Sequence, residues 1–260
     1  MPVVRSYEES AVVVAGASTG VGYASALTFI DAGVRRLALL SRSEERGIAA
    51  RDRIRERHPD ATVEFVQVDV DDVEQVAMAI DRAHELLGSI DVLVSSVTAQ
   101  YRPELLFRID PYDIARILNG QALPPMFLTR SVLPLMREQG GGSIVLVASD
   151  AAKVATPGET VLGAAMAAIV TFARTVAMEA KRDGIRVNAV TPSLIAGTAT
   201  AERVLKDGFS KALFEKAAKM ASLGVAEAQD LAELIVFLGG PAAAKLTGQA
   251  ISVNGGISAA

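Results

Sequence analysis

The apolar positions of the chain fall into short runs that alternate with longer amphipathic stretches from one end to the other. Each run is rich in Val, Ile, Leu and Ala. Because strands buried on both faces of a parallel sheet have this near-continuous apolar character, the pattern predicts repeated βαβ units. We expect seven strands, at Ala11–Ala15, Arg36–Leu40, Thr62–Gln67, Ile90–Ser95, Ser143–Ala148, Arg186–Val190 and Ala250–Val253.

The stretches between these strands have helical length, and no low-complexity linker or block of like charges marks a domain boundary. We therefore expect one domain over residues 1–260, an α/β three-layer Rossmann fold with a doubly wound, seven-stranded parallel sheet. Right-handed crossovers place the ligand crevice of such a sheet at the carboxyl ends of its strands. The loops that would form it begin near Gly16, Ser41, Asp69, Ser95, Ser149 and Pro192.

Composition and charge exclude several classes of protein. Half of the 260 residues are apolar, and the formal net charge of -4 argues against a dedicated nucleic-acid surface. The chain has no Cys, and His58 and His84 are too isolated to suggest a metal cluster. The first residues do not resemble a signal peptide, and the apolar stretch Val161–Ala173 is too short to span a bilayer. We therefore expect a cytoplasmic protein with no membrane contact.

A glycine-rich turn follows the first expected strand. The chain reads Ala-Gly-Ala-Ser-Thr-Gly-Val-Gly over residues 15–22 and then enters a helical stretch. Glycines at such a turn let backbone N–H groups approach a pyrophosphate at the positive end of the helix. A tight turn that needs small residues only for packing would have the same glycine pattern. The position of this turn between a strand and a helix is what favours dinucleotide binding.

The spacing of Gly16, Gly20 and Gly22 resembles the fingerprint of the short-chain dehydrogenase/reductase family, and other features of that family follow in order over nearly the whole chain. Residues 185–192 resemble its sixth strand. Residues 246–256 resemble its C-terminal strand, which usually ends Asp-Gly-Gly and here ends Asn-Gly-Gly. The resemblance implies a Rossmann fold, oxidoreductase activity and an NAD or NADP cofactor held by Gly16, Ser18, Gly20, Val21, Gly22, Asp69 and Val70.

The end of the second expected strand carries a basic residue, Arg42, and no acidic residue. Leu40-Ser41-Arg42 offers no carboxylate to accept a hydrogen bond from a ribose 2′-hydroxyl. If a dinucleotide binds, Arg42 favours a 2′-phosphate and hence NADP. A solvated helix start containing Arg42 and Arg46 explains the same residues equally well, and a chain that binds no cofactor remains an open alternative.

Hydride transfer to a carbonyl carbon needs a proton on the carbonyl oxygen. The resemblance implies that relatives supply it from a Tyr held near a Lys, while a Ser polarises the same oxygen. Ser149 matches the Ser at the end of the fifth expected strand. Thirteen residues further on, the Tyr position is Leu162, and one helical turn later the Lys position is Met166. Neither side chain donates a proton or holds a charge, so we predict that the chain has lost the reactive pair.

Two more family positions differ in the same cleft. The position of the Asn that maintains a water link in relatives falls on Gln121, although Asn119 lies two residues earlier and Pro124-Pro125 should interrupt the helix and obscure its register. The Asn-Asn-Ala-Gly loop after the fourth strand is replaced by Ser-Ser-Val-Thr over residues 95–98. Because the four departures converge on one cleft, we infer that selection for the redox step was relaxed or redirected.

Other polar residues lie in loops near the expected crevice, namely Lys153, Tyr101 and Asp150. A general acid has to lie within hydrogen-bond reach of the reacting oxygen. Ordinary loop roles explain these three residues more simply than catalysis does.

Three functional hypotheses follow. The first is a degenerate subunit, inactive alone, of a tetrameric NAD(P)-dependent alcohol dehydrogenase or ketoreductase that contains an active paralogue; it resembles the degenerate subunit of family members that act on a CoA thioester. The alanines of the expected helix at Val161–Ala180 would face either that partner or the sheet of the same subunit. The second is an isomerase, dehydratase, cyclase or atypical reductase whose apolar pocket is lined by Leu162 and Met166. The third is a nucleotide-binding protein without turnover.

Overall fold

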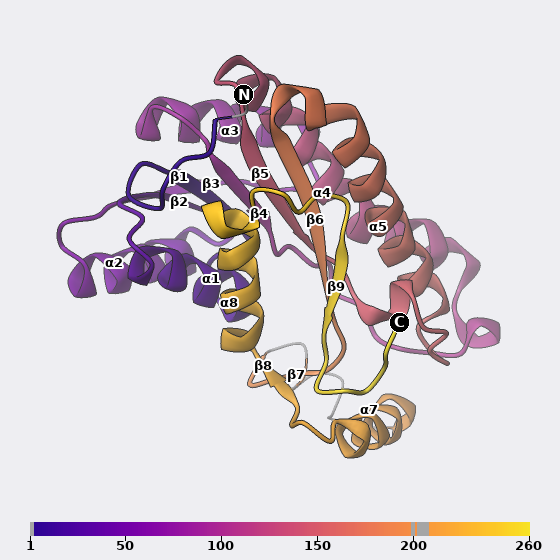
Figure 1. Cartoon of the computed structure of the whole chain (residues 1–260). Coiled ribbons are helices and arrows are strands. Elements are labelled where there is room, and N and C mark those ends of the chain that lie inside the picture. The colour runs from indigo at the N-terminus through magenta and orange to yellow at the C-terminus, as the bar shows by residue number, and fades with distance from the viewer. Residues whose placement is uncertain (1–2, 199–200, 202–207) are drawn as a thin grey trace.

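The structure, a computed structural model, describes residues 3–198, 201 and 208–260. A parallel sheet of seven strands runs through its centre (Figure 1). The strand order β3-β2-β1-β4-β5-β6-β9 confirms the doubly wound Rossmann fold that the sequence predicts. The strands are β1 (Ala11–Ala15), β2 (Arg36–Ser41), β3 (Thr62–Gln67), β4 (Val92–Ser95), β5 (Gly142–Val147), β6 (Ile185–Pro192) and β9 (Ala250–Val253).

Strands β1, β3 and β9 have the bounds that the hydrophobic pattern predicts; β2 and β4 differ by one or two residues at one end, and β5 and β6 differ by one or two residues at both ends. Two further strands, β7 (Ile195–Ala196) and β8 (Ala226–Glu227), pair with each other outside the main sheet. Strands of two residues show no alternation of apolar and polar positions, so the sequence pattern does not predict them.

Helices cover both faces of the sheet (Figure 1). One face carries α1 (Gly20–Asp31), α2 (Glu44–Arg57) and α8 (Ala228–Gly239), and the other carries α3 (Val73–Leu87), α4 (Pro111–Glu138) and α5 (Thr160–Ala180). The helix α7 (Gly208–Met220) lies apart from these layers, beyond the carboxyl ends of the strands.

Both faces of the central strands are buried, and successive residues alternate between two cores. Val13 packs in the core beneath α3, α4 and α5, whereas Val12 and Val14 pack beneath α1, α2 and α8. All three side chains are fully buried. Because the faces of such a strand hold apolar side chains, polar chemistry is restricted to the strand ends.

Helix α4 continues through Pro124 and Pro125, which corrects the expected interruption. Each proline removes one backbone donor from the helix. Both prolines are buried, and α4 packs against α3 and α5, so tertiary packing offsets the lost hydrogen bonds. The continuous helix sets the register that the sequence left open, with Gln121 buried and Asn119 exposed.

By length and composition, one described helix, Thr160–Asp183, is long and apolar enough to cross a membrane, although its unbroken apolar stretch, Val161–Ala173, is shorter than a bilayer requires. The inner side of α5 packs in the core beneath the sheet through Ala165, Ile169 and Ala173. A core helix of a globular domain has this composition as well, and we interpret α5 in that way.

The burial of α4 predicts the effect of two leucine substitutions. Leu128 is fully buried, whereas Leu123 on the same helix is 37% exposed. We expect Leu128→Ala to lower the free energy of unfolding by about 2–5 kcal/mol because it leaves a cavity in the core. Leu123→Ala should change it by about 0.5 kcal/mol or less. Urea denaturation followed by circular dichroism measures both, and equal losses would contradict this description of the core.

Candidate functional site

The carboxyl ends of the central strands meet where the strand order reverses, between β1 and β4. Ala15 at the end of β1 lies opposite Ser95 at the end of β4. The loop that follows β1 is in close contact with the loop that follows β4, since a Cβ added to Gly16 would lie 2.5 Å from the carbonyl oxygen of Ser96. Ligands of doubly wound sheets bind at this kind of switch point.

The glycine-rich turn has the geometry that a pyrophosphate needs. Gly16 and Gly20 have positive φ values of 81° and 57°, which favour glycine. A Cβ on Gly22 would lie 2.3 Å from the carbonyl oxygen of Gly16, so this glycine is required for packing. Among the described residues, a Cβ on Gly20 would meet nothing closer than the methyl group of Thr198 at 3.9 Å.

The first turn of α1 begins at Gly20 and has no side-chain cap. The N-cap residue Thr19 makes no side-chain hydrogen bond to the helix. Backbone N–H groups at the start of α1 are therefore available to an anion, and the turn fits the diphosphate of a dinucleotide. Ser18 is half-buried in the turn, whereas Val21 is 7% exposed and packs in the core beneath α1, α2 and α8.

The predicted adenine and ribose contacts lie together at the adjoining ends of β2 and β3. Arg42 is exposed directly after β2, and its carbonyl oxygen accepts a hydrogen bond from the side chain of Gln67 at 3.1 Å. Asp69 is half-buried and its carboxylate accepts a hydrogen bond from the backbone N–H of Asp71 at 3.2 Å, while Val70 packs against the core. Burial and the neighbouring Asp69 raise the pKa of Asp71, and the charge of Arg42 partly opposes them.

The two positions of the proton relay hold apolar side chains that belong to the core. Leu162 lies in the first turn of α5, is half-buried and packs against the core beneath α3, α4 and α5. Met166, one turn later, is 6% exposed and is part of that core. Neither residue lines the cavity beside Ser149, and an apolar substrate pocket lined by the two stays a prediction.

Ser149 remains at the carboxyl end of β5, where the sequence places it. Its hydroxyl oxygen accepts a hydrogen bond from the backbone N–H of Ala151 at 3.2 Å and caps a short 3-10 helix at Asp150–Ala152. The side chain also borders a cavity of about 270 Å³ between the β5–α5 loop, α7 and the C-terminal residues. Ser149 can therefore donate a hydrogen bond to a ligand oxygen there.

The side chain of Gln121 holds the loop after β4. It is 2% exposed, donates a hydrogen bond to the carbonyl oxygen of Ala99 at 3.0 Å and accepts one from the hydroxyl of Thr98 at 3.2 Å. Both hydrogen bonds of the Gln121 side-chain amide therefore go to the segment after β4, where the family has Asn-Asn-Ala-Gly. The hydroxyl of Ser95 in that loop is buried and, within the described part of the chain, has no hydrogen-bond partner.

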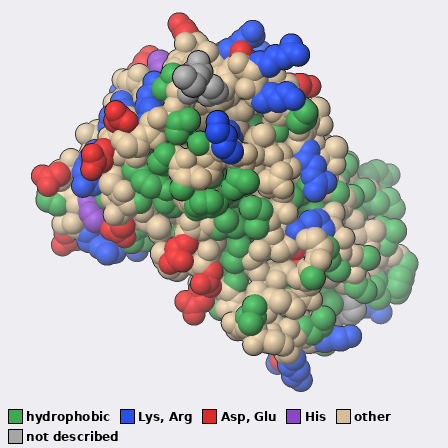
Figure 2. Space-filling view, in the orientation of Figure 1, with side chains coloured by type: hydrophobic (Ala, Val, Ile, Leu, Met, Phe, Trp, Pro, Cys, Tyr) green, Lys and Arg blue, Asp and Glu red, His purple; other side chains and the backbone are tan. Residues whose placement is uncertain are grey.

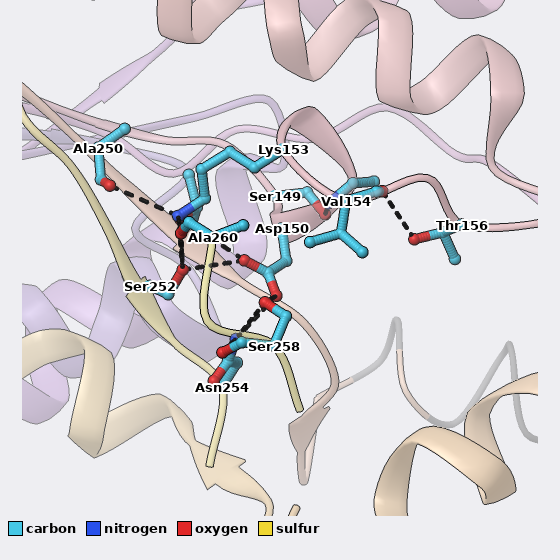
Figure 3. Close-up of polar contacts among 12 residues, drawn as sticks. Ser149, Asp150, Lys153, Val154, Thr156, Ala250, Ser252, Asn254, Ser258 and Ala260 are labelled. Atoms are coloured by element: carbon cyan, nitrogen blue, oxygen red, sulfur yellow. Dashed lines mark hydrogen bonds and ion pairs between the residues drawn. The ribbon is translucent and has the colours of Figure 1, made fainter. Parts of the chain in front are cut away.

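Asp150 and Lys153 hold the C-terminal tail, residues 254–260, against the loop after β5 (Figure 3). The Asp150 carboxylate, 5% exposed, accepts hydrogen bonds from Ser252 at 2.9 Å, from Asn254 at 2.7 Å and from Ser258. Lys153 donates to the hydroxyl of Ser252 at 2.5 Å and to the carbonyl oxygen of the final residue, Ala260, at 2.6 Å.

This network gives both residues a structural role. Burial lowers the pKa of Lys153, and the charge of Asp150 partly opposes that shift. The Nζ atom of Lys153 lies 3.8 Å from the Oδ1 atom of Asp150, and the two side chains form an ion pair. The polar atoms of both side chains are therefore occupied by Ser252 and the C-terminal tail.

Tyr101 is likewise held by a contact within the chain. Its hydroxyl donates a hydrogen bond to the carbonyl oxygen of Gly158. Burial raises the pKa of Tyr101 to about 12, and the nearby carboxylate of Glu159 adds to the shift. A phenol held in this state keeps its proton at neutral pH.

Glu159 is a residue of the site that the sequence reasoning missed. It immediately precedes α5, and its side chain lines the same cavity as Ser149. Burial raises the pKa of the Glu159 carboxyl to about 7. Glu159 lies between Ser149 and Leu162, and the family spacing assigns no role to the residues between these two positions. Its place directly after Pro157-Gly158 was the one sequence feature that could have drawn attention to it. No group of three or more potential metal ligands occurs among the described residues.

Comparisons with known proteins agree with this geometry. Residues 16–258 match the family model described as Enoyl-(Acyl carrier protein) reductase. The chain is 32% identical to the short-chain dehydrogenase srdC of Neurospora crassa, over 95% of this chain and 96% of that one. It is 27% identical to the 3-oxoacyl-(acyl-carrier-protein) reductase FabG of Vibrio harveyi, over 94% of this chain and 96% of that one.

One of the similar solved structures has the same fold along its whole length. It is a short-chain oxidoreductase from Pseudomonas aeruginosa PAO1 with NADPH bound, described as containing an atypical catalytic center. The two chains are 26% identical with a TM-score of 0.89, over 99% of this chain and 100% of that one.

The contact between Asn254 and Asp150 predicts the effect of placing the family's usual acid at position 254. In Asn254→Asp two carboxylates would face each other and one donor to Asp150 would be lost. We expect the free energy of unfolding to fall by about 1–3 kcal/mol at neutral pH, and the loss to shrink towards about pH 4 as a carboxyl takes up a proton. The swap Asp150→Asn with Asn254→Asp should recover most of the loss. Thermal unfolding tests this, and a neutral single variant would contradict the network.

Proposed function

Since this chain belongs to the short-chain dehydrogenase/reductase family, we propose that it is the non-catalytic subunit of a hetero-oligomeric NAD(P)-dependent alcohol dehydrogenase or ketoreductase. The observation that carries the proposal is the pair Leu162 and Met166 at the positions of the proton relay. Reduction of a ketone adds a hydride to carbon and a proton to oxygen. A chain with two apolar side chains at these positions has no family route for the proton.

The loops around the cleft support the same proposal. Lys153 and Asp150 bond to the C-terminal tail, Tyr101 bonds to Gly158, and Gln121 bonds to the loop after β4. Each bond stabilises the shape of the site. A subunit that keeps this shape without the relay is suited to supporting a partner.

The nucleotide half of the site fits a dinucleotide, whose nicotinamide would supply or accept the hydride. In this proposal the first turn of α1 binds the pyrophosphate, Asp69 and Val70 lie beside the adenine, and Arg42 binds a 2′-phosphate. The absence of an acid after β2 favours NADP over NAD. The Pseudomonas aeruginosa relative, which was solved with NADPH, supports this preference.

The outer face of α5 suits a partner helix in a tetramer. Ala165, Ala173 and Ala177 are buried towards the sheet, whereas Ala164 is exposed. The alanines of this helix therefore face both directions. Small exposed residues allow two helices to approach closely, and Met178, which is 60% exposed, adds apolar area to this face.

A second apolar surface lies over α8 and the edge strand β9. Figure 2 shows hydrophobic side chains gathered across the middle of the face where Figure 1 places these two elements. Phe237 of α8 is 39% exposed. We propose that an active paralogue covers one or both surfaces. The arrangement resembles 2-(hydroxy(phenyl)methyl)succinyl-CoA dehydrogenase, which pairs an active with a degenerate subunit, and a CoA thioester is the substrate class that we propose for the complex.

A second candidate function is an oxidoreductase with altered chemistry. The specific observation in its favour is Glu159, an ionisable carboxyl in the cavity beside Ser149. The relative with an atypical catalytic center makes such a change conceivable within this fold. Substantial turnover by the chain without a partner distinguishes this candidate from the first.

The assignment of Arg42 predicts the cofactor preference. We expect Arg42→Ala to weaken NADP binding about tenfold, equivalent to about 1.4 kcal/mol, because a charge-assisted bond to the 2′-phosphate is lost. NAD binding should not change. Arg46→Ala, an exposed arginine in the first turn of α2, is the matched control. Calorimetric titration of NADP and NAD into the three proteins measures all six affinities, and equal NADP affinity of the wild type and Arg42→Ala would refute the assignment.

The partner surface predicts how two exposed methionines differ. We expect native mass spectrometry of the chain purified from its own host to show a hetero-oligomer with a family member that carries an intact Tyr and Lys. Met178→Glu on α5 should reduce the fraction of this complex at least about tenfold, because a charge would be buried against the partner. Met78→Glu on α3, where Met78 is 64% exposed, should leave it intact. A homo-oligomer with ordinary turnover would argue against the proposal.

A further inference from the structure

A cavity at the amino ends of the central strands lies at the opposite edge of the sheet from the glycine-rich turn. It has a volume of about 150 Å³ and is formed where β4, β5 and β6 begin. The N-terminal segment and the loop between α8 and β9 complete its wall with Val3, Arg5, Ser10, Lys245 and Thr247. Because pockets for drug-sized ligands hold about 300–1,000 Å³, this cavity accepts only a small ion or the end of a larger molecule.

Among the described residues, the wall of this cavity carries four basic side chains and one acidic side chain. The basic residues are Arg5, Lys181, Arg186 and Lys245, and the acidic residue is Asp91. The formal charge of the wall is therefore +3, although the whole chain carries a net charge of -4. An excess of positive charge around a concave space attracts anions.

Asp91 does not cancel the remaining cations, because Arg5 already compensates its charge. The two side chains form an ion pair. The Asp91 carboxylate also accepts hydrogen bonds from the backbone N–H of Ala11 at 2.8 Å, from the hydroxyl of Ser89 at 2.9 Å and from the amide of Gln139 at 3.2 Å. Four donors occupy this carboxylate, so the other three basic side chains carry the excess charge.

Arg186 is the basic residue whose side chain is held in place. Its guanidinium donates to the carbonyl oxygens of Leu238 at 2.7 Å, Gly239 at 3.3 Å and Gly240 at 3.1 Å. These bonds satisfy oxygens at the end of α8 that would otherwise repel an anion. A guanidinium has five N–H donors, and two of those on Arg186 have no acceptor in the part of the chain that the structure describes. Burial lowers the pKa of Arg186 to about 10, so the group stays charged at neutral pH.

Thr247 and two lysines add to the donors around this cavity. The hydroxyl oxygen of Thr247 accepts from the backbone N–H of Val187 at 3.0 Å, and its proton has no acceptor among the described residues. Lys181 and Lys245 are exposed, and neither forms an ion pair with a described residue. An exposed lysine is ordinarily only solvated. These two lysines differ because they share one cavity with a guanidinium that keeps unused donors.

We propose that this cavity binds a phosphate dianion, either as the free ion or as the end of a phosphate monoester. Arg186 and Thr247 donate hydrogen bonds to its oxygens, and Lys181 and Lys245 compensate its charge. A dianion suits the wall better than a monovalent anion, since three cations are uncompensated. The site is separate from the glycine-rich turn, and its function does not depend on the proposed assembly with a partner.

The test measures the reactivity of individual lysines in the full-length chain. The protein is acetylated briefly at about pH 8, where phosphate is mainly the dianion, and the acetylation rate of each lysine is measured by peptide mass spectrometry. Sodium chloride at equal ionic strength is the reference. At ten times its dissociation constant, inorganic phosphate should slow acetylation of Lys181 and Lys245 about tenfold. Lys219, an exposed lysine of α7 outside the cavity, should react as before.

Two variants test whether the lysines share one ion. Lys245→Gln should weaken the protection of Lys181 by phosphate about fivefold, and Lys181→Gln should weaken the protection of Lys245 to the same extent, because one charge contact is lost. Lys219→Gln is the matched control and should leave the protection of both lysines unchanged. Arg186 is kept in every variant, since its bonds hold the end of α8.

Ethyl phosphate carries the same dianionic group as inorganic phosphate and distinguishes the two sources. Protection at a lower concentration of ethyl phosphate identifies a monoester as the ligand, whereas equal or better protection by inorganic phosphate identifies the free ion. Three results would overturn the inference: protection by both compounds no greater than that by sodium chloride, equal protection of Lys219, or unchanged protection of Lys181 in Lys245→Gln.

Discussion

Burial of the sheet on both faces is the constraint on which the rest of the structure depends. Val12, Val13 and Val14 alternate between two apolar cores, so the faces of β1 have no place for a polar ligand group. The glycine turn after β1, the loop after β4 and Ser149 after β5 therefore meet at one edge. Any ligand chemistry at that edge has to be assembled from the few side chains that these loops and the first turns of their helices contribute.

The start of α5 shows how this constraint acts on the missing relay. An ammonium at position 166 would need a partner or solvent, because a charge is costly in an apolar core. The thioether of Met166 needs neither and packs in the core beneath α3, α4 and α5. The loop ahead of α5 is held by the bonds of Asp150 and Lys153 to the C-terminal tail. The site thus keeps a defined shape through packing and hydrogen bonds, while the family's proton donor is absent.

The sequence predicted features that depend on local pattern. The runs at β1, β3 and β9 gave the strand bounds, and the spacing of Gly16, Gly20 and Gly22 gave the turn that the structure contains. Features that depend on distant contacts were not predictable. The bond from Asn254 to Asp150 joins residues about a hundred positions apart, and the prolines of α4 are accommodated through packing. Glu159 was missed because its raised pKa arises from burial, which a residue count does not reveal.

The most direct test of the central claim is a single-turnover measurement on the isolated chain. Purified protein, free of any partner, is mixed with NADPH and a saturating ketone or CoA-linked oxo substrate, and absorbance of the reduced nicotinamide is followed by stopped flow. The account predicts loss of absorbance no faster than without protein, because Leu162 and Met166 move no proton. Oxidation of one NADPH per subunit at a rate typical of an active dehydrogenase, about 1 per second or faster, would contradict it.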